Sequence, residues 1–297
     1  MRSASPARRS FVAVAAALLL ATPPALAGQS AEWFELSSRR QTDGVEFLEA
    51  DIEYGFGRLE VGPAEAGLLY QFDLRYDARR FEPVRSWNAA DGIGQLAFQL
   101  HSEDGNFEFG DFEDVDSDEF GSLSLKLGSE VPTNLSLGVM AAEARLHLGG
   151  LALSRLVFRT GASEASIDFD EPNPVRMDRL ELAAGAADFR ATGLGNARFD
   201  RIEFVGAVGD VRLDFRGAWE GTAEGEIRVG LGSLQLTFPR ALGVRIEKQR
   251  GFLTSFDSAG FDLVEGAYQT PNWESAASRL TLSIRAGLGE IDVDFVD

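Results

Sequence analysis

The chain has 297 residues, a formal net charge of −19 from 47 acidic and 28 basic residues, and no cysteine. A chain this acidic is unsuited to nucleic acid or anionic lipid, because both are bound by clustered Lys and Arg. The acidic charge leaves cations, basic protein patches and neutral glycans as the partners to consider. The lack of cysteine excludes disulfides, thiol chemistry and lipid attachment through a cysteine.

The first 27 residues (1–27) read as a secretory signal peptide. A basic head precedes an apolar stretch over 11–20 and a small-x-small cleavage site at 25–27, and the apolar run is too short to span a bilayer. We therefore expect an exported protein of the periplasm or cell surface, with a retained N-terminal anchor as the alternative. Cleavage would remove three arginines and change the net charge to −22, from 25 basic and 47 acidic residues. The three arginines of the signal are Arg2, Arg8 and Arg9.

Residues 28–121 are predicted to form an N-terminal β section with irregular strands. Alternating runs at 53–59 and 68–76 favour strands, and the section ends in an acidic, glycine-containing stretch over 104–119.

That acidic stretch holds the first three ligand spacings of a calcium loop, at Asp114, Asp116 and Asp118. The pattern then fails, because Glu119 stands where the loop needs glycine and Leu125 where it needs a bidentate glutamate. An EF-hand is excluded. An irregular calcium site and a solvated acidic loop remain as alternatives.

Residues 122–297 are predicted to form a section of glycine-centred repeats. Glycines recur every 21 to 24 residues, each between two runs that alternate apolar and polar residues. About 23 residues in one straight strand would span roughly 75 Å, so we expect each repeat to fold back as two short strands around a glycine bend. Stacked repeats would give an all-β, solenoid-like fold with one buried and one wet face; an up-and-down barrel is the competing arrangement. The repeat glycines are Gly138, Gly161, Gly185, Gly206 and Gly230.

The repeat loosens over 251–279, where five aromatic residues accompany Pro271, and returns in a last strand pair around Gly287. Because exposed ends of a stack invite aggregation, we interpret this aromatic segment as a cap in preference to a ligand site.

A resemblance covers most of the chain after the signal. The runs at 67–72, 76–77 and 92–96, together with Phe81-Glu82-Pro83, resemble the toast-rack domain of bacterial cell-envelope proteins. The stretch from residue 123 onward resembles the downstream region of those proteins, and also the C-terminal region of membrane-anchored regulators of the response to cell-wall-active antibiotics and of adhesins. The resemblance implies a stacked β fold in the envelope without catalysis. This chain lacks the transmembrane helices of the regulators after its signal.

The sequence offers little for catalysis. The Gly-x-Gly pairs each open a strand, whereas a dinucleotide loop opens a helix, and the only histidines are His101 and His147. We therefore predict no enzyme, no cofactor and no catalytic, cofactor-binding or metal residues. Sugar chemistry by paired carboxylates is the remaining enzymatic alternative, with outward acids at Asp168, Glu203 and Asp214 as its candidates.

These observations predict an exported, non-enzymatic cell-envelope protein that acts as an interaction scaffold or an envelope-stress accessory module, with other envelope proteins as partners. The alternative is an adhesin or glycan-binding module. Its stacking residues would be Trp219, Tyr268 and Trp273.

Overall fold

A computed structural model describes residues 31–102, 121–248, 253–256 and 258–297. Residues from Glu32 to Asp297 form one compact unit. The predicted signal peptide and the acidic stretch 104–119, with its three calcium-loop aspartates, lie outside the described residues. The prediction of an all-β chain is confirmed: strands dominate, and the described residues add a short 3₁₀ turn, η3 (Leu194–Ala197).

The strands are β1 (Trp33–Gln41), β2 (Phe47–Pro63), β3 (Leu68–Asp77), β4 (Phe81–Ala90), β5 (Ile93–Ser102), β6 (Gly121–Leu127), β7 (Thr133–His147), β8 (Leu153–Asp168), β9 (Met177–Thr192), β10 (Phe199–Asp214), β11 (Thr222–Pro239), β12 (Gly243–Lys248), β13 (Leu253–Phe256), β14 (Asp262–Val264), β15 (Ala267–Gln269) and β16 (Arg279–Val296).

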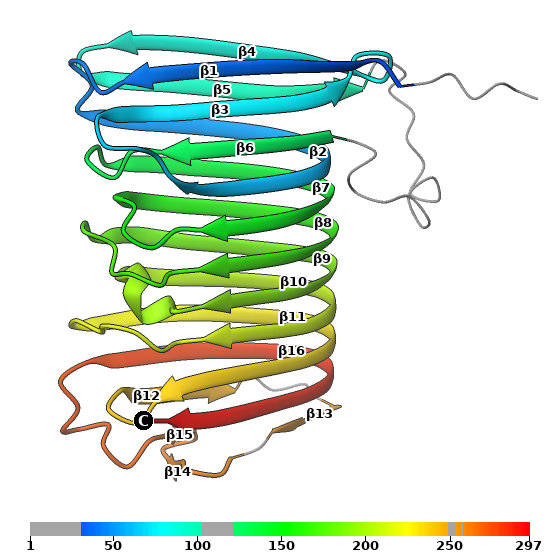
Figure 1. Cartoon of the computed structure of the whole chain (residues 1–297). Coiled ribbons are helices and arrows are strands. Elements are labelled where there is room, and N and C mark those ends of the chain that lie inside the picture. Colours follow the sequence, from blue (N-terminus) through cyan, green and yellow to red (C-terminus); the bar gives the residue numbers. More distant parts are fainter. Residues whose placement is uncertain (1–30, 103–120, 249–252, 257) are drawn as a thin grey trace, which may run out of the picture. The chain divides into compact units, whose positions relative to one another are not determined.

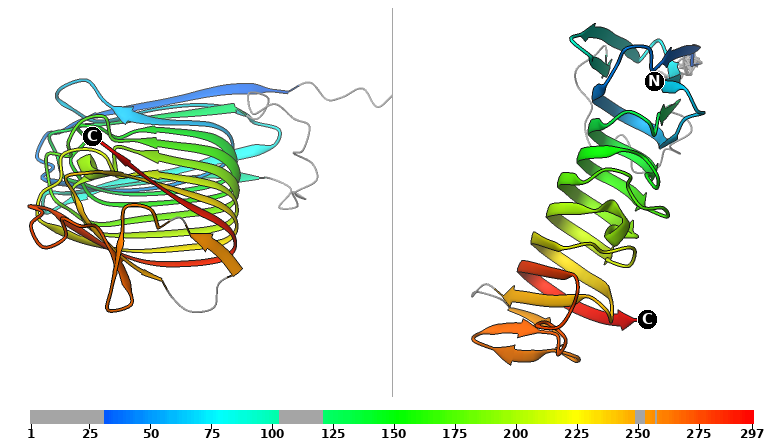
Figure 2. Two further views of the ribbon diagram at one scale, coloured as in Figure 1. Left: turned by 90° about the horizontal axis from the view of Figure 1, so that it is seen from below. Right: turned by 90° about the vertical axis from the view of Figure 1, so that its left-hand side faces the viewer.

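Seven long strands lie parallel to one another in the order β2-β7-β8-β9-β10-β11-β16, and each bends back near its middle (Figures 1 and 2). We call the part of each strand before the bend the first arm and the part after it the second arm. From β7 to β11, paired residues are 20 to 24 positions apart in sequence, as in Leu135↔Leu156 and Leu156↔Leu180.

The expectation of two short strands separated by a turn is wrong, because the pairing of neighbouring strands continues through the bend. The register runs Gly206↔Val229 just before the bend and resumes at Val208↔Leu231 just after it. In a parallel stack, the residues on both sides of the bend can hydrogen-bond to the next strand, so no turn with internal hydrogen bonds is needed.

The core lies between the two arms. One row of first-arm residues, with Phe158, Leu182 and Phe204 at its centre, is almost completely buried. Phe189 on the second arm faces this row, with ring centroids 6.3 Å from Phe158 and 5.1 Å from Phe204. Alternation along each strand therefore places one set of side chains in the core and the other set on the outer face.

Close backbone approach explains the glycines at the bend. A Cβ at Gly161 would lie 2.5 Å from the carbonyl oxygen of Met140, and one at Gly185 would lie 2.7 Å from that of Gly161. The row continues through Ala207, Gly230 and Gly287. Two glycines of the predicted series lie outside this row: Gly206 precedes Ala207, and Gly138 lies two positions before Met140.

Both ends of the stack depart from sequence order. The outer neighbours of β2 are β5 along its first arm and β6 along its second arm, while those of β16 are β12 and β13. At the β2 end, the later strands β5 and β6 thus pair outside the earlier β2, whereas at the other end the later β16 pairs inside the earlier β12 and β13. Antiparallel strands follow beyond these, β4 and β3–β1 at one end and β15–β14 at the other. The strands β13 to β15 lie at the end of the sheet opposite β1. They come from the predicted aromatic capping segment.

Candidate binding face

The outer face of the first arms carries a hollow of about 600 Å³ at the β4 end of the stack, which we call the trough. It crosses five strands, β4, β5, β2, β7 and β8. In the right-hand view of Figure 2, β4 turns outward from the line of the bent strands. A hollow of this volume is in the range of small-ligand sites. Its outward side chains include Glu49, Asp51, Asn134, Ser136, Arg155 and Arg159.

Charge in the trough is separated by strand. Acidic side chains stand on β2, at Glu49 and Asp51, and basic ones stand on β8, at Arg155 and Arg159. Between them, β7 presents only neutral side chains. The register places Asp51 beside Ser136, and Ser136 beside Val157 of β8. The strands β2 and β8 are two strand spacings apart, about 9–10 Å, and β7 separates the acidic row from the basic row.

Glu53 extends the acidic row toward the bend and leans over β7. Its carboxylate occupies the space that a Cβ at Gly138 would need. Burial raises the pKa of Glu53, and the nearby Asp51 raises it further, while Arg159 partly offsets both effects. Within the described residues, no ion pair joins Glu49, Asp51 or Glu53 to a cation. Glu49 accepts a hydrogen bond from the amide of Gln95 at 3.0 Å.

The basic side of the trough has more cations than anions. Glu181 of β9 lies 2.5 Å from Arg155, 3.7 Å from Arg159 and 3.6 Å from Arg179, so one carboxylate serves three guanidinium groups. Glu203 is 3.9 Å from Arg179 and adds a weaker contact. The Arg159 side chain keeps 62% of its surface exposed. It therefore has hydrogen-bond donors available to a ligand.

Two smaller hollows of about 350 and 130 Å³ continue along the same face. The first is bordered by Glu53, Gly138 and Met140, and the second by Glu181, Ala183 and Glu203. Arg159 borders both of them and the trough. The small residues at Gly138 and Ala183 flank Arg159 in one row across the strands and leave this space open.

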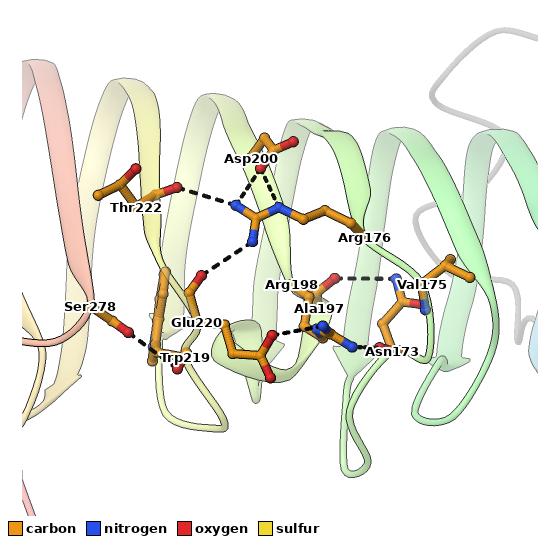
Figure 3. Close-up of polar contacts among 10 residues, drawn as sticks. All are labelled: Asn173, Val175, Arg176, Ala197, Arg198, Asp200, Trp219, Glu220, Thr222 and Ser278. Atoms are coloured by element: carbon orange, nitrogen blue, oxygen red, sulfur yellow. Dashed lines mark hydrogen bonds and ion pairs between the residues drawn. The ribbon is translucent and has the colours of Figure 1, made fainter.

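The loops that connect successive bent strands have the opposite character (Figure 3). Asn173 is fully buried, and its amide donates to the carbonyl oxygens of Leu153 at 2.8 Å and Ala197 at 3.2 Å. Arg176 donates to Asp200 at 2.5 Å and to the carbonyl oxygen of Glu220 at 3.2 Å.

Arg198 completes this connecting-loop network. It donates to the carbonyl oxygen of Asn173 at 3.1 Å and to the carboxylate of Glu220 at 2.7 Å. The loop side chains therefore connect one bent strand to the next, although the buried Nε of Arg198 has no hydrogen-bond partner among the described residues.

The predicted stacking aromatics each contact other side chains of the protein. Trp219 packs on Phe199 and Phe215, and its indole N–H donates to the Phe215 carbonyl oxygen at 2.6 Å. The ring of Tyr268 lies 4.8 Å from that of Phe256, and the Arg279 guanidinium lies 5.8 Å from the ring of Trp273.

The carboxylates considered for sugar chemistry are divided between the two arms. Asp168 accepts a hydrogen bond from Thr192 at 2.7 Å, and Asp214 accepts one from Arg216 at 2.8 Å, both on second arms. Glu203 lies on the first arm of β10. Among the described residues, no group of three or more His, Asp and Glu side chains is arranged to hold a metal ion.

The trough was not predicted from the sequence. The acids at positions 49, 51 and 53 alternate along one strand, which is a recognisable outward pattern. Their relation to Arg155 and Arg159 depends on β2 pairing with β7, a strand about 85 residues later, as in Ala50↔Leu135. No local pattern specifies that pairing.

The fold and the surface together define an all-β protein whose parallel, bent strands present a charged outer face. Residues 30–188 match the family described as the N-terminal domain of toast_rack, DUF2154, and the chain belongs to this toast-rack family. The match extends past residue 121, where the sequence predicted the end of the N-terminal section. Its sequence matches none of the curated proteins. Within the described residues, no helix is long and apolar enough to cross a membrane.

Two solved structures of bacterial proteins match this chain. One, from Clostridium sporogenes, is provisionally named a cell adhesion protein; it is 16% identical, with a TM-score of 0.46, over 89% of this chain and 100% of that chain. The other, from Bacteroides fragilis, is provisionally named an adhesin; it is 8% identical, with a TM-score of 0.39, over 89% of this chain and 98% of that chain.

Proposed function

We propose that the protein is an exported, non-enzymatic component of the cell envelope that acts as an interaction scaffold and binds a partner on the outer face of its first arms. The carrying observation is the trough, where Asp51 and Glu53 have no ion-pair partner among the described residues, and Arg155 and Arg159 share the carboxylate of Glu181. Elsewhere on the same stack, polar side chains such as Asn173 and Arg198 are bonded to neighbouring loops. Membership of the toast-rack family and the signal-like residues 1–27 support the envelope location.

The proposal treats the bent strands as repeats of a β-solenoid-like scaffold with about 23 residues per repeat. The in-register pairing of Leu180 with Ile202, and of Ile202 with Gly225, supports this period. A scaffold of this kind offers an extended surface, and its rigidity comes from neighbouring repeats.

The partner we propose is another envelope protein. A glycan held by aromatic stacking is less well supported, because the rings of Trp219 and Tyr268 pack against other aromatic rings of the protein. The net charge of −19 also disfavours nucleic acid.

A photo-crosslinking amino acid at position 136 tests this proposal. Ser136 borders the trough on the first arm of β7, and Ser166 on the second arm of β8 is a matched outward-facing control. In the native envelope, we expect a discrete protein adduct from position 136 that is absent from position 166. Identical adduct patterns at the two positions, or no adduct at either, would contradict the proposal.

A further inference from the structure

We infer that the trough binds an extended peptide segment that carries a cationic and an anionic side chain on the same side, two residues apart. The inference rests on the proposed function and names the chemistry of the partner. It follows from the placement of acids on β2 and arginines on β8, with neutral β7 between them.

The spacing of the charges supports a segment that crosses the strands. The two charged rows are about 9–10 Å apart, and alternate side chains of an extended peptide are about 7 Å apart on one side. The reach of Lys and Glu side chains covers the remaining distance. Glu53 shortens the gap further, because its carboxylate leans over Gly138 toward β8. A cationic side chain would then meet Asp51 and Glu53, and an anionic side chain would meet Arg159.

The floor of the trough suits a peptide backbone. Ser136 and Asn134 of β7 supply a hydroxyl and an amide that can hydrogen-bond to backbone groups crossing above them. Val157 faces outward from β8 but is only 7% exposed, so the floor beside these groups is apolar and tightly packed. A trough with polar groups on a firm apolar floor fixes the orientation of a ligand.

Net charge alone predicts a different preference. A protein with a charge of −19 should attract a doubly cationic peptide most strongly, a mixed-charge peptide less and a doubly anionic one least. The trough predicts that the mixed-charge peptide binds best, because a second cation would face Arg155 and Arg159, which already outnumber their carboxylate. The two explanations therefore differ in which peptide should bind most tightly.

The test uses the full chain and three blocked peptides, acetyl-Ala-Lys-Ala-Glu-Ala-amide and its Lys/Lys and Glu/Glu counterparts, titrated by NMR or calorimetry at physiological salt. We expect the mixed peptide to bind about tenfold more tightly than either like-charge peptide, the effect of one charge-assisted hydrogen bond. Binding of the Lys/Lys peptide that equals or exceeds that of the mixed peptide would overturn the inference.

Two variants locate the site. Arg159→Gln should weaken the mixed peptide about tenfold and make the Lys/Lys peptide the better ligand. Arg228→Gln, in the same row but on β11 outside the trough, should leave the ranking unchanged. Unchanged binding in Arg159→Gln contradicts the inference. If position 136 still yields a protein adduct while the peptides rank by net charge, the scaffold function stands and only the mixed-charge recognition fails.

Discussion

Two regions of this protein use the same kinds of side chain for different purposes. In the connecting loops, Asn173 and Arg198 are bonded to the backbone and carboxylates of the next loops (Figure 3). In the trough, Asn134 and Arg159 come from regular strands and face the outside. The loop side chains connect successive strands, whereas Arg159 of the trough makes a long ion pair, 3.7 Å from Glu181, and its side chain is 62% exposed. The difference lies in how many hydrogen bonds the protein supplies, because residue type is the same in both regions.

The largest expected difference is between two asparagines. Asn173→Ala should lower the free energy of unfolding by about 2–4 kcal/mol, because it leaves the buried N–H and carbonyl oxygen of Leu153 and the carbonyl oxygen of Ala197 without this partner. Asn134→Ala should change the same quantity by less than about 0.5 kcal/mol. Urea denaturation of both variants measures this difference. Equal losses would mean that the trough is as much a structural element as the loops.

A smaller difference is expected between two arginines. Arg176→Ala removes hydrogen bonds to Asp200 and to two backbone carbonyl groups, and should lower the free energy of unfolding by about 1 kcal/mol. Arg159 makes a long ion pair with Glu181, so Arg159→Ala should change the free energy of unfolding by less than about 0.5 kcal/mol. A loss in Arg159→Ala that matches the loss in Arg176→Ala would remove the distinction between the two regions.

The smallest effect should be a gain in stability at Glu53. The pKa of Glu53 is raised in the folded protein, so folding favours its protonated form. The stability linked to that form is fully present below the unfolded-state pKa of 4.5. It is lost as the pH rises through the folded-state pKa. Glu53→Gln mimics the protonated form. It should therefore raise the melting temperature slightly at about pH 7 and leave it unchanged at about pH 3.5.

Glu60→Gln is the control for that change. Glu60 is on the second arm of the same strand, in register with Arg145, and its replacement should not stabilise the protein at about pH 7. Thermal melts of both variants at the two pH values decide the point. A lower melting temperature for Glu53→Gln at about pH 7 would show that its carboxylate is paired in the folded protein.

Some features of the fold could be predicted from the sequence because they depend on local pattern. Alternation of apolar and polar residues identified the strands, and the spacing of the glycines identified the bends. The same reasoning misplaced Gly138, which lies outside the glycine row at the bend and instead makes room for the side chain of Glu53. It also expected a turn where the chain makes a continuous bent strand, because a single repeat does not reveal the hydrogen bonds that its neighbours supply.

The candidate site depended on contacts between distant parts of the chain. Acids at 49–53 and arginines at 155 and 159 are each ordinary outward residues of a strand, and nothing local relates them. The sheet order relates them, because β7 pairs with β2 on one side and with β8 on the other. The aromatic residues Trp219 and Tyr268 show the reverse case, since they are conspicuous in the sequence but pack on other aromatic rings in the structure.

The amino-acid pattern alone predicts that the chain is all-β, that its strands have one wet and one buried face, and that bends recur every 21 to 24 residues between β7 and β11. These properties follow from alternation and from residues without a Cβ, both of which act over a few positions. The strand order at the two ends and the separation of charge in the trough became visible in the folded chain alone. Both depend on which strands lie side by side, and strand pairing is determined by burial of the whole core and cannot be read from one segment.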